Sequence, residues 1–112
     1  MTDNVRITIF LRHDQSKNLA QIDDILFAQG FWSSFPPAGV TIVSWQVLMG
    51  IGQVLTLEMT PEKVREVNVM IESKAWGAFR TEFYPTYDFM SVLEKKRAMA
   101  ATWKPQEGTG KK

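Results

Sequence analysis

His13 is the only histidine in the 112-residue chain, and its imidazole could act as a general base near neutral pH. A lone histidine at the end of a predicted strand is equally well explained by a structural role, half exposed or bonded to a carbonyl group. It could also serve as an axial haem ligand. The chain therefore offers one side chain for proton transfer, with a structural role as its alternative.

Five further side chains could bind a ligand. The planar guanidinium of Arg80 could hold a carboxylate or phosphate, or else bond the carbonyls at the end of the preceding helix or pair with Glu82. Trp45 and Trp76 could stack on a planar ligand, although core or interface packing explains them as well. The remaining candidate binding residues are Gln53 and Tyr84.

Other chemistries are excluded by what the chain lacks. It contains no cysteine, so thiolate nucleophiles, disulfides and cysteine-based metal sites are ruled out. Asp23 and Asp24 are adjacent on a predicted helix and point in different directions, so they cannot share a metal. The segment 50–52, Gly-Ile-Gly, lacks the third glycine of a dinucleotide fingerprint and joins two predicted strands. We therefore predict no metal and no cofactor.

The distribution of charge argues against nucleic acid as a partner. Net charge is +1, but residues 1–93 carry 7 basic and 10 acidic side chains, and residues 94–112 carry 6 and 2. The mildly acidic body lacks the basic stripe that phosphate binding needs. An RNA-recognition domain would present aromatic and basic residues on its third strand, where this chain has GQVLTLEM. No segment has the pattern of a signal peptide or a membrane span, so we expect a cytoplasmic protein without membrane contact.

Hydrophobic periods predict the elements that carry these residues. Val5 to Leu11 alternates as a half-buried strand, with His13 on its buried-face parity. Residues 19–29 have a helical stripe at Leu19, Ile22, Ile25, Leu26 and Gln29, capped by Asp14 or Ser16 and stopped by Gly30. The next nine residues, FWSSFPPAG (31–39), are expected to lack regular structure. Their aromatics either fold back as a lid over the core or pack on a second subunit.

The second half of the chain predicts a hairpin, a helix and a further strand. Residues 40–49 and 53–59 predict a hairpin reversed at Gly50 and Gly52. Thr60 and Pro61 are expected to begin a helix that buries Val64, Val67, Met70 and Ile71 and ends at Gly77. Residues 81–87 predict an edge strand, because Pro85 lacks an N–H donor. Asp88 could cap a short last helix to about Met99, so we expect one domain over 1–100 and a flexible basic tail over 101–112.

Two interleaved strand–helix–strand halves predict a four-stranded antiparallel sheet with both helices on one face and the first and third strands in the centre. Parity places Leu55 and Ile9 beneath the helices. The opposite face then receives Arg6, Thr8, Phe10, Val54, Thr56 and Glu58, with Ile42 or Val43 added from the edge strand. Arg6 should lie near Glu58. A mixed, uncovered sheet face is a natural docking surface, so we expect a homodimer built sheet to sheet.

With its strands RITIFLRH, VTIVSWQVLMGIGQVLTLEM and RTEFYPTYDF, the chain resembles the dimeric α+β barrel superfamily of ferredoxin-like βαββαβ domains over residues 5–100. That resemblance implies a homodimer with a pocket between sheet and helices. Members include cofactor-free monooxygenases, isomerases, haem-handling proteins and small domains without an assigned role. The fold alone assigns no reaction.

The expected fold brings His13, Trp45, Gln53, Trp76, Arg80 and Tyr84 toward one edge of the sheet. By parity Tyr84 points toward the partner instead if Phe83 faces the helices. The first functional hypothesis is a small-molecule-binding or cofactor-independent enzyme-like domain of monooxygenase or isomerase type. In it His13 transfers a proton and Arg80 holds an anionic group of a partly apolar substrate. The alternatives are a non-catalytic dimeric interaction module and an amino-acid-sensing regulatory domain. The sequence counts against the last, because such domains are usually attached to an enzyme.

Overall fold

The computed structural model describes residues 3–105 as a four-stranded antiparallel sheet with several helices, which confirms the predicted α+β class. In chain order the elements are β1 (Val5–His13), α1 (Leu19–Ala28), α2 (Phe31–Ser34), β2 (Thr41–Leu48), β3 (Gly52–Met59), the 3-10 helix η1 (Pro61–Lys63), α3 (Val64–Lys74), β4 (Phe79–Thr86) and α4 (Met90–Ala100). The expected basic tail over 101–112 lies partly outside the described residues.

The strand order is β2-β3-β1-β4, so β1 and β3 lie in the centre of the sheet, as predicted. They run antiparallel, with Val5 opposite Met59 and Leu11 opposite Gln53. β4 is an edge strand and contains Pro85, also as predicted. A proline is tolerated there because one side of an edge strand needs no N–H donor.

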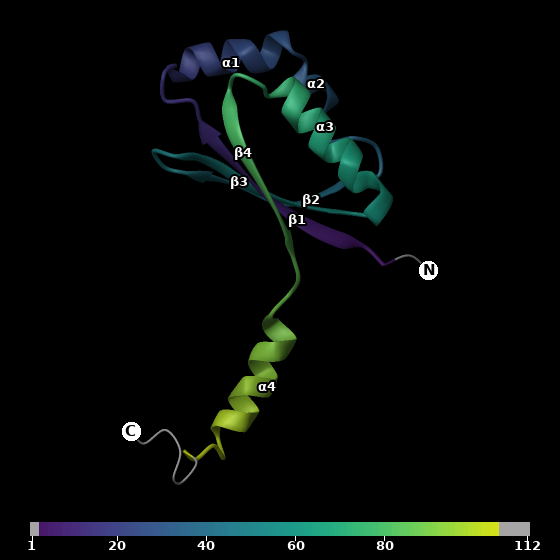
Figure 1. Cartoon of the computed structure of the whole chain (residues 1–112), viewed down its shortest axis with the longest axis vertical. Coiled ribbons are helices and arrows are strands. Elements are labelled where there is room, and N and C mark those ends of the chain that lie inside the picture. Colours follow the sequence, from purple (N-terminus) through teal and green to yellow (C-terminus); the bar gives the residue numbers. More distant parts are fainter. Residues whose placement is uncertain (1–2, 106–112) are drawn as a thin grey trace.

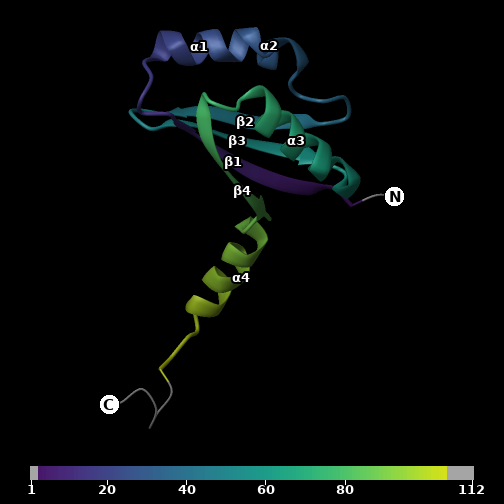
Figure 2. The ribbon, with the colours of Figure 1, turned by 45° about the horizontal axis from the view of Figure 1, so that its top comes forward.

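Helices α1, α2 and α3 all cover the same face of the sheet (Figures 1 and 2). The alternating strands and the helical stripes meet in one core between the two layers. Its fully buried large side chains are Ile9, Leu11, Leu26, Phe31, Leu55, Leu57, Met59, Val67 and Ile71. Burial of each such side chain stabilises the fold by about 1.5–3 kcal/mol, so this layer holds the sheet and helices together.

Helix α1 begins at Leu19, where the predicted stripe begins, but neither of the two expected cap residues, Asp14 or Ser16, caps it. Asn18 caps it, accepting a hydrogen bond from the Gln21 N–H at 2.8 Å, while the Gln21 side chain accepts one from the Asn18 N–H. This reciprocal capping box satisfies two N–H groups at once. Asp14, an expected cap, instead accepts hydrogen bonds from Ser16 and Lys17. The helix stops at Gly30, whose φ of 76° suits a residue without a Cβ.

The prediction that residues 31–39 lack regular structure is wrong for the first four residues, which form the short helix α2. Phe31 is completely buried and stacks on Phe35 with ring centroids 5.1 Å apart. Burial of an aromatic ring against the core outweighs the weak helical preference of so short a segment. The lid alternative therefore describes Phe31 and Phe35, whereas Trp32 remains exposed.

The hairpin between β2 and β3 turns at Gly50 and Gly52, as predicted. A Cβ on Gly52 would lie 1.9 Å from the Leu11 carbonyl oxygen, so this position has no room for a side chain. The β2–β3 register shifts between Ile42 and Ser44. Ile42 therefore lies opposite Leu57 on the helix-covered side, so Ile42 is the wrong one of the two alternatives, Ile42 or Val43, expected on the open face.

The second long helix is preceded by a 3-10 turn. Thr60 and Pro61 begin η1 rather than α3, and Thr60 makes no side-chain cap. Val67 and Ile71 are buried, as predicted from their spacing. The helix ends at Lys74, and Gly77 (φ 89°) lies in the turn that leads to β4.

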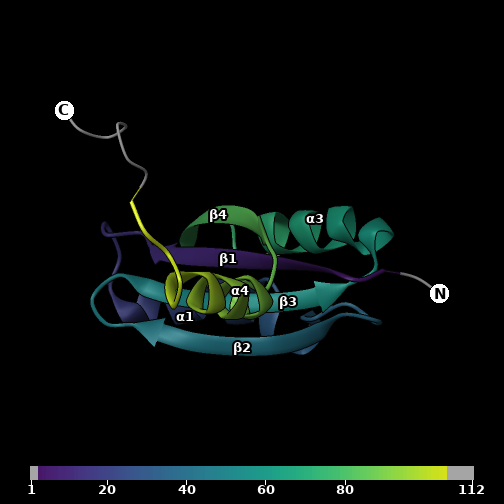
Figure 3. The same cartoon turned by 90° about the horizontal axis from the view of Figure 1, so that it is seen from below.

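The last helix, α4, leaves the end of β4 and extends away from the side of the sheet that α1 and α3 do not cover (Figures 1 and 3). Asp88 accepts a hydrogen bond from the Met90 N–H at 3.3 Å, but the N-cap of α4 is Phe89, so the predicted cap lies one residue before the actual one. No side chain of α4 is fully buried. In the described part of the chain, no helix has both the length and the apolar character needed to cross a bilayer.

Candidate functional site

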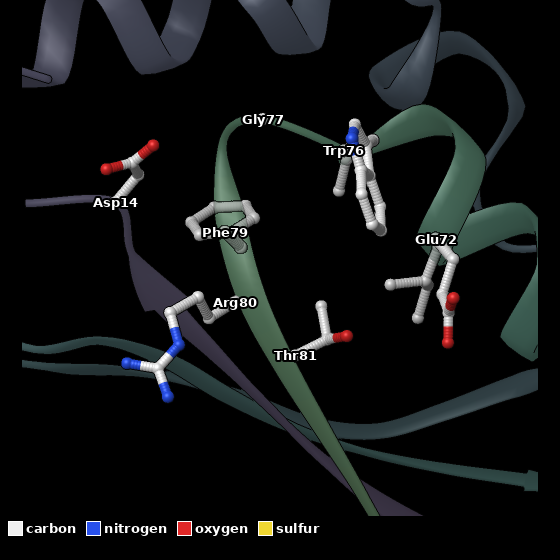
Figure 4. A pocket seen from close by; sticks show the side chains of 9 residues that line it. Asp14, Glu72, Trp76, Gly77, Phe79, Arg80 and Thr81 are labelled. Carbon is white, nitrogen blue, oxygen red and sulfur yellow. The ribbon is translucent and has the colours of Figure 1, made fainter. Parts of the chain in front are cut away.

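A hollow of about 460 Å³ opens where α3 ends and β4 begins (Figure 4). It is lined by Asp14, Ile71, Glu72, Ala75, Trp76, Gly77, Phe79, Arg80 and Thr81. Two of the sequence-predicted binding residues, Trp76 and Arg80, thus line one depression. The Trp76 side chain is 71% exposed, so its ring is available to a ligand.

The polar groups of this hollow do not converge on one point. In Figure 4 the Arg80 side chain points away from the Trp76 ring, whereas Thr81 and Glu72 lie on the Trp76 side of β4. Successive residues of a strand point to opposite faces, which separates Arg80 from its neighbours Phe79 and Thr81. A ligand stacked on Trp76 would therefore have to extend around the edge of β4 to meet the guanidinium.

The carboxylate of Asp14 is already occupied. It accepts hydrogen bonds from the Lys17 Nζ at 2.8 Å and from the Ser16 Oγ at 2.7 Å. These bonds, together with the Ser16 backbone N–H, hold the pKa of Asp14 well below its ordinary value. Asp14 therefore stays ionised at neutral pH and is a poor proton donor there.

His13 lies at the end of β1 and does not line this hollow. Its ring stacks on Phe79 with centroids 5.9 Å apart, and its backbone N–H donates to the Ile51 carbonyl at 2.8 Å. The ring is half-buried on the helix-covered side. These contacts are those of a residue that packs the end of a strand, which was the structural alternative.

Trp45 and Gln53 form a second group, over β2 and β3. The Trp45 Nε1–H donates to the Gln53 Oε1 at 2.7 Å. The Trp45 ring packs against Phe31, Phe35 and Trp32 beneath the α2 segment. Its half-buried N–H is thus satisfied within the chain, and the pair serves packing beneath the lid.

Tyr84 lies in a third place, on the open face of the sheet. It sits opposite Thr8 and makes an edge contact with Phe10 at 5.9 Å. The prediction that all six residues meet at one edge is therefore wrong. Strand parity turns Tyr84 to the other face, and packing draws Trp45 beneath α2. The condition attached to Tyr84 is met, since Phe83 packs against the core.

The open face is a grid of side chains from all four strands. Its rows, written from β2 to β4, are Thr41–Glu58–Arg6–Thr86, Ser44–Thr56–Thr8–Tyr84, Gln46–Val54–Phe10–Glu82 and Leu48–Gly52–Arg12–Arg80. Phe10, Val54 and Tyr84 occupy its middle rows. The six face residues predicted from β1 and β3 are all present.

Ion pairs flank this apolar centre at both ends. Arg6 bonds Glu58 at 2.9 Å, as predicted, and Arg12 bonds Glu82 at 3.2 Å. Hydrogen bonds from Asn4 and Arg6 lower the pKa of Glu58. The expected ion pair between Arg80 and Glu82 is wrong. Glu82 lies opposite Phe10 on β1, diagonally next to Arg12, and it pairs with Arg12 instead. Alternation along β1 and β4 was the signal that could have identified the Arg12 pair.

The open face thus has an apolar centre within a polar border, which is the common composition of a protein–protein interface. Between residues 3 and 105, no cluster of three or more histidine or acidic side chains could hold a metal ion. Comparison with protein-family models, with curated proteins and with solved structures found no match.

Proposed function

We propose that this chain is a self-associating interaction module of ferredoxin-like topology, which acts as a homodimer joined through the open face of its sheet. The strand order β2-β3-β1-β4, with two crossover helices on one side, supports the topology. The dimer is the arrangement that the resemblance to the dimeric α+β barrels implies.

The observation that carries this proposal is the apolar centre of the open face. Phe10 and Val54 are only half-buried, and Tyr84 is 49% exposed, on a face that no helix of the described chain packs against. Contiguous apolar side chains within a polar border are uncommon on a surface that meets only water. A second copy would cover this face and leave the two flanking ion pairs at the rim.

Substitution of Phe10 by Glu tests this assignment, with the molecular mass measured by sedimentation velocity over a range of concentrations. The new carboxylate would lie opposite Glu82 and in the centre of the interface, so the variant should be monomeric where the parent chain is dimeric. Phe27→Glu is the matched control, because Phe27 is exposed on α1 and away from this face. A parent chain that is monomeric at all concentrations, or a Phe10→Glu dimer, contradicts the proposal.

The hollow at Trp76 favours a second candidate, a small-molecule-binding or cofactor-independent enzyme-like role of monooxygenase or isomerase type. Its volume is within the range of about 300–1,000 Å³ that ligand pockets occupy. The position of His13 outside this hollow weighs against proton transfer to a ligand held there. The sheet face is therefore the better supported site.

Native mass spectrometry of the purified protein tests the second candidate. A bound molecule that is lost in Trp76→Ala and retained in the control Trp103→Ala would support it. If the role is catalytic, His13→Ala should abolish turnover with little change in melting temperature. An unaltered ligand profile in both Trp76→Ala and His13→Ala would leave only the interaction module.

A further inference from the structure

Helix α4 has no partner among the other described elements. It follows Thr86 after the short connection 87–89 and projects from the open side of the sheet (Figures 1 and 3). Phe89 is 53% exposed, and Met90, Met99 and Trp103 are likewise exposed. An isolated helix of this length is marginal in water, so α4 needs packing from elsewhere to persist.

The overall size of the molecule also indicates that part of the chain lacks a packing partner. Its radius of gyration is 19.7 Å, whereas a compact domain of this length has about 13 Å. Its accessible surface is 8093 Å², against roughly 6,300 Å² for a compact monomer of this mass. The excess is roughly twice the area, about 800 Å², that each partner of a standard protein–protein interface buries.

Helix α4 and its flanking residues, 89–105, form an arm, and the residues of its helix fall on two faces. One face carries an apolar stripe from the N-cap to the last helical residue: Phe89, Val92, Leu93, Met99 and Ala100. The other carries Ser91, Glu94, Lys95 and Ala98. Lys96 interrupts the stripe, but its aliphatic stem can lie along an apolar surface while its ammonium group reaches water.

We propose that α4 is an exchanged arm: its apolar stripe packs on the open sheet face of a second copy of this chain, over Phe10, Val54 and Tyr84. This inference rests on the proposed self-association, and it replaces direct contact between the two sheets by contact through the exchanged helices. Each open face is then covered by the helix of the other copy, so the two sheets approach through a helical layer. The two uncovered apolar surfaces of one chain, a sheet face and a helix stripe, are thereby paired reciprocally, as a two-fold dimer requires.

Charge argues against contact between two arms. Residues 89–105 carry Lys95, Lys96, Arg97 and Lys104 against the single acidic Glu94, so two arms would repel each other. The open face carries Glu58 and Glu82 beside Arg6, Arg12 and Arg80. The contact between arm and open face is therefore one of apolar side chains within a border of mixed charge.

The first test compares two full-length variants by sedimentation velocity. Leu93→Glu places a carboxylate in the stripe and should weaken dimerisation at least tenfold. Ala98→Glu adds the same charge to the opposite face of the same helix and should change it less than threefold. Dimers of Leu93→Glu as tight as the parent, combined with loss of dimers in Phe10→Glu, would overturn the exchange and leave self-association intact. A monomeric parent chain would overturn both.

The second test needs no disruptive substitution. Benzoylphenylalanine is placed at Phe89 in the full-length chain, the protein is mixed with a nitrogen-15-labelled copy, and cross-linked peptides are analysed by mass spectrometry. Cross-links from the arm to β1 or β3 peptides of the other isotope are the expected result. Cross-links confined to one isotope would show that the arm folds onto its own sheet and would refute the exchange.

Discussion

Replacement of Gly52 by Ala should destabilise the fold far more than the same replacement at Gly50, two residues earlier in the same hairpin. A Cβ at Gly52 would lie 1.9 Å from the Leu11 carbonyl oxygen and 2.9 Å from its carbon. Both atoms belong to the backbone of the central strand β1, so they cannot rotate aside as a side chain could. The strands must separate locally.

The magnitude follows from two contributions. An alanine held at the Gly52 φ of 155° is strained by about 1–3 kcal/mol. Displacement of the packed β1 backbone adds about 1–3 kcal/mol. Gly50 also has a positive φ, 81°, but nothing lies within 4 Å of its Cβ position, so its replacement should cost only about 1–2 kcal/mol.

Urea denaturation of both variants at one fixed protein concentration measures this difference. With a slope of about 1–2 kcal/mol per molar urea, a loss of about 4 kcal/mol lowers the midpoint by roughly 2–4 M. A chain of this length has a total stability of about 6–17 kcal/mol, so the Gly52→Ala variant should remain measurable. Equal midpoints for the two variants would refute the close approach of β3 to β1 at this turn.

Three further outcomes are expected. Phe31→Ala should lower stability by about 3–5 kcal/mol, because the ring is fully buried, whereas Trp32→Ala should cost less, because that residue is 42% exposed; equal losses in urea denaturation would contradict the anchoring role of Phe31. Asn18→Ala should cost about 1 kcal/mol through loss of the capping box, and Gln15→Ala, one turn earlier and exposed, should cost nothing measurable in the same assay. Because folding lowers the pKa of Glu58, its ionised form stabilises the native state above its ordinary value of 4.5, and this contribution is lost as the pH falls through the lower folded value. Stability measured from pH 6 to pH 3 should therefore decline less steeply in Glu58→Gln than in the parent, and identical slopes would argue against the bond to Arg6.

The sheet and its two faces could be predicted because β1 and β3 alternate strictly. Ile9 and Leu55 fall on one side and Thr8 and Thr56 on the other, and a slip of the pairing by one residue would turn the apolar set of a strand to the open face. The bonding of Arg6 to Glu58 followed from that register alone.

The errors come from features that have no periodic signal. The irregularity at Val43 reverses the parity of β2, which turned Ile42 inward. The short helix α2 forms because Phe31 is buried, a tertiary effect that local composition does not report. The predicted site combined residues from the ends of several strands and helices. An error in the expected direction of any one side chain therefore moved that residue away from the others. Strand parity thus placed Tyr84 on the open face, whereas packing drew Trp45 beneath α2.

The two margins of the sheet differ in their resistance to unwanted growth. On the β4 margin, Pro85 removes a hydrogen-bond donor, which discourages another strand from adding there. On the β2 margin, the irregularity at Val43 disturbs only the beginning of the strand, and the stretch from Ser44 to Leu48 contains neither proline nor lysine. Crowded or partly unfolded copies would therefore join edge to edge along β2, which makes this strand the place to introduce a lysine if the protein precipitates at high concentration.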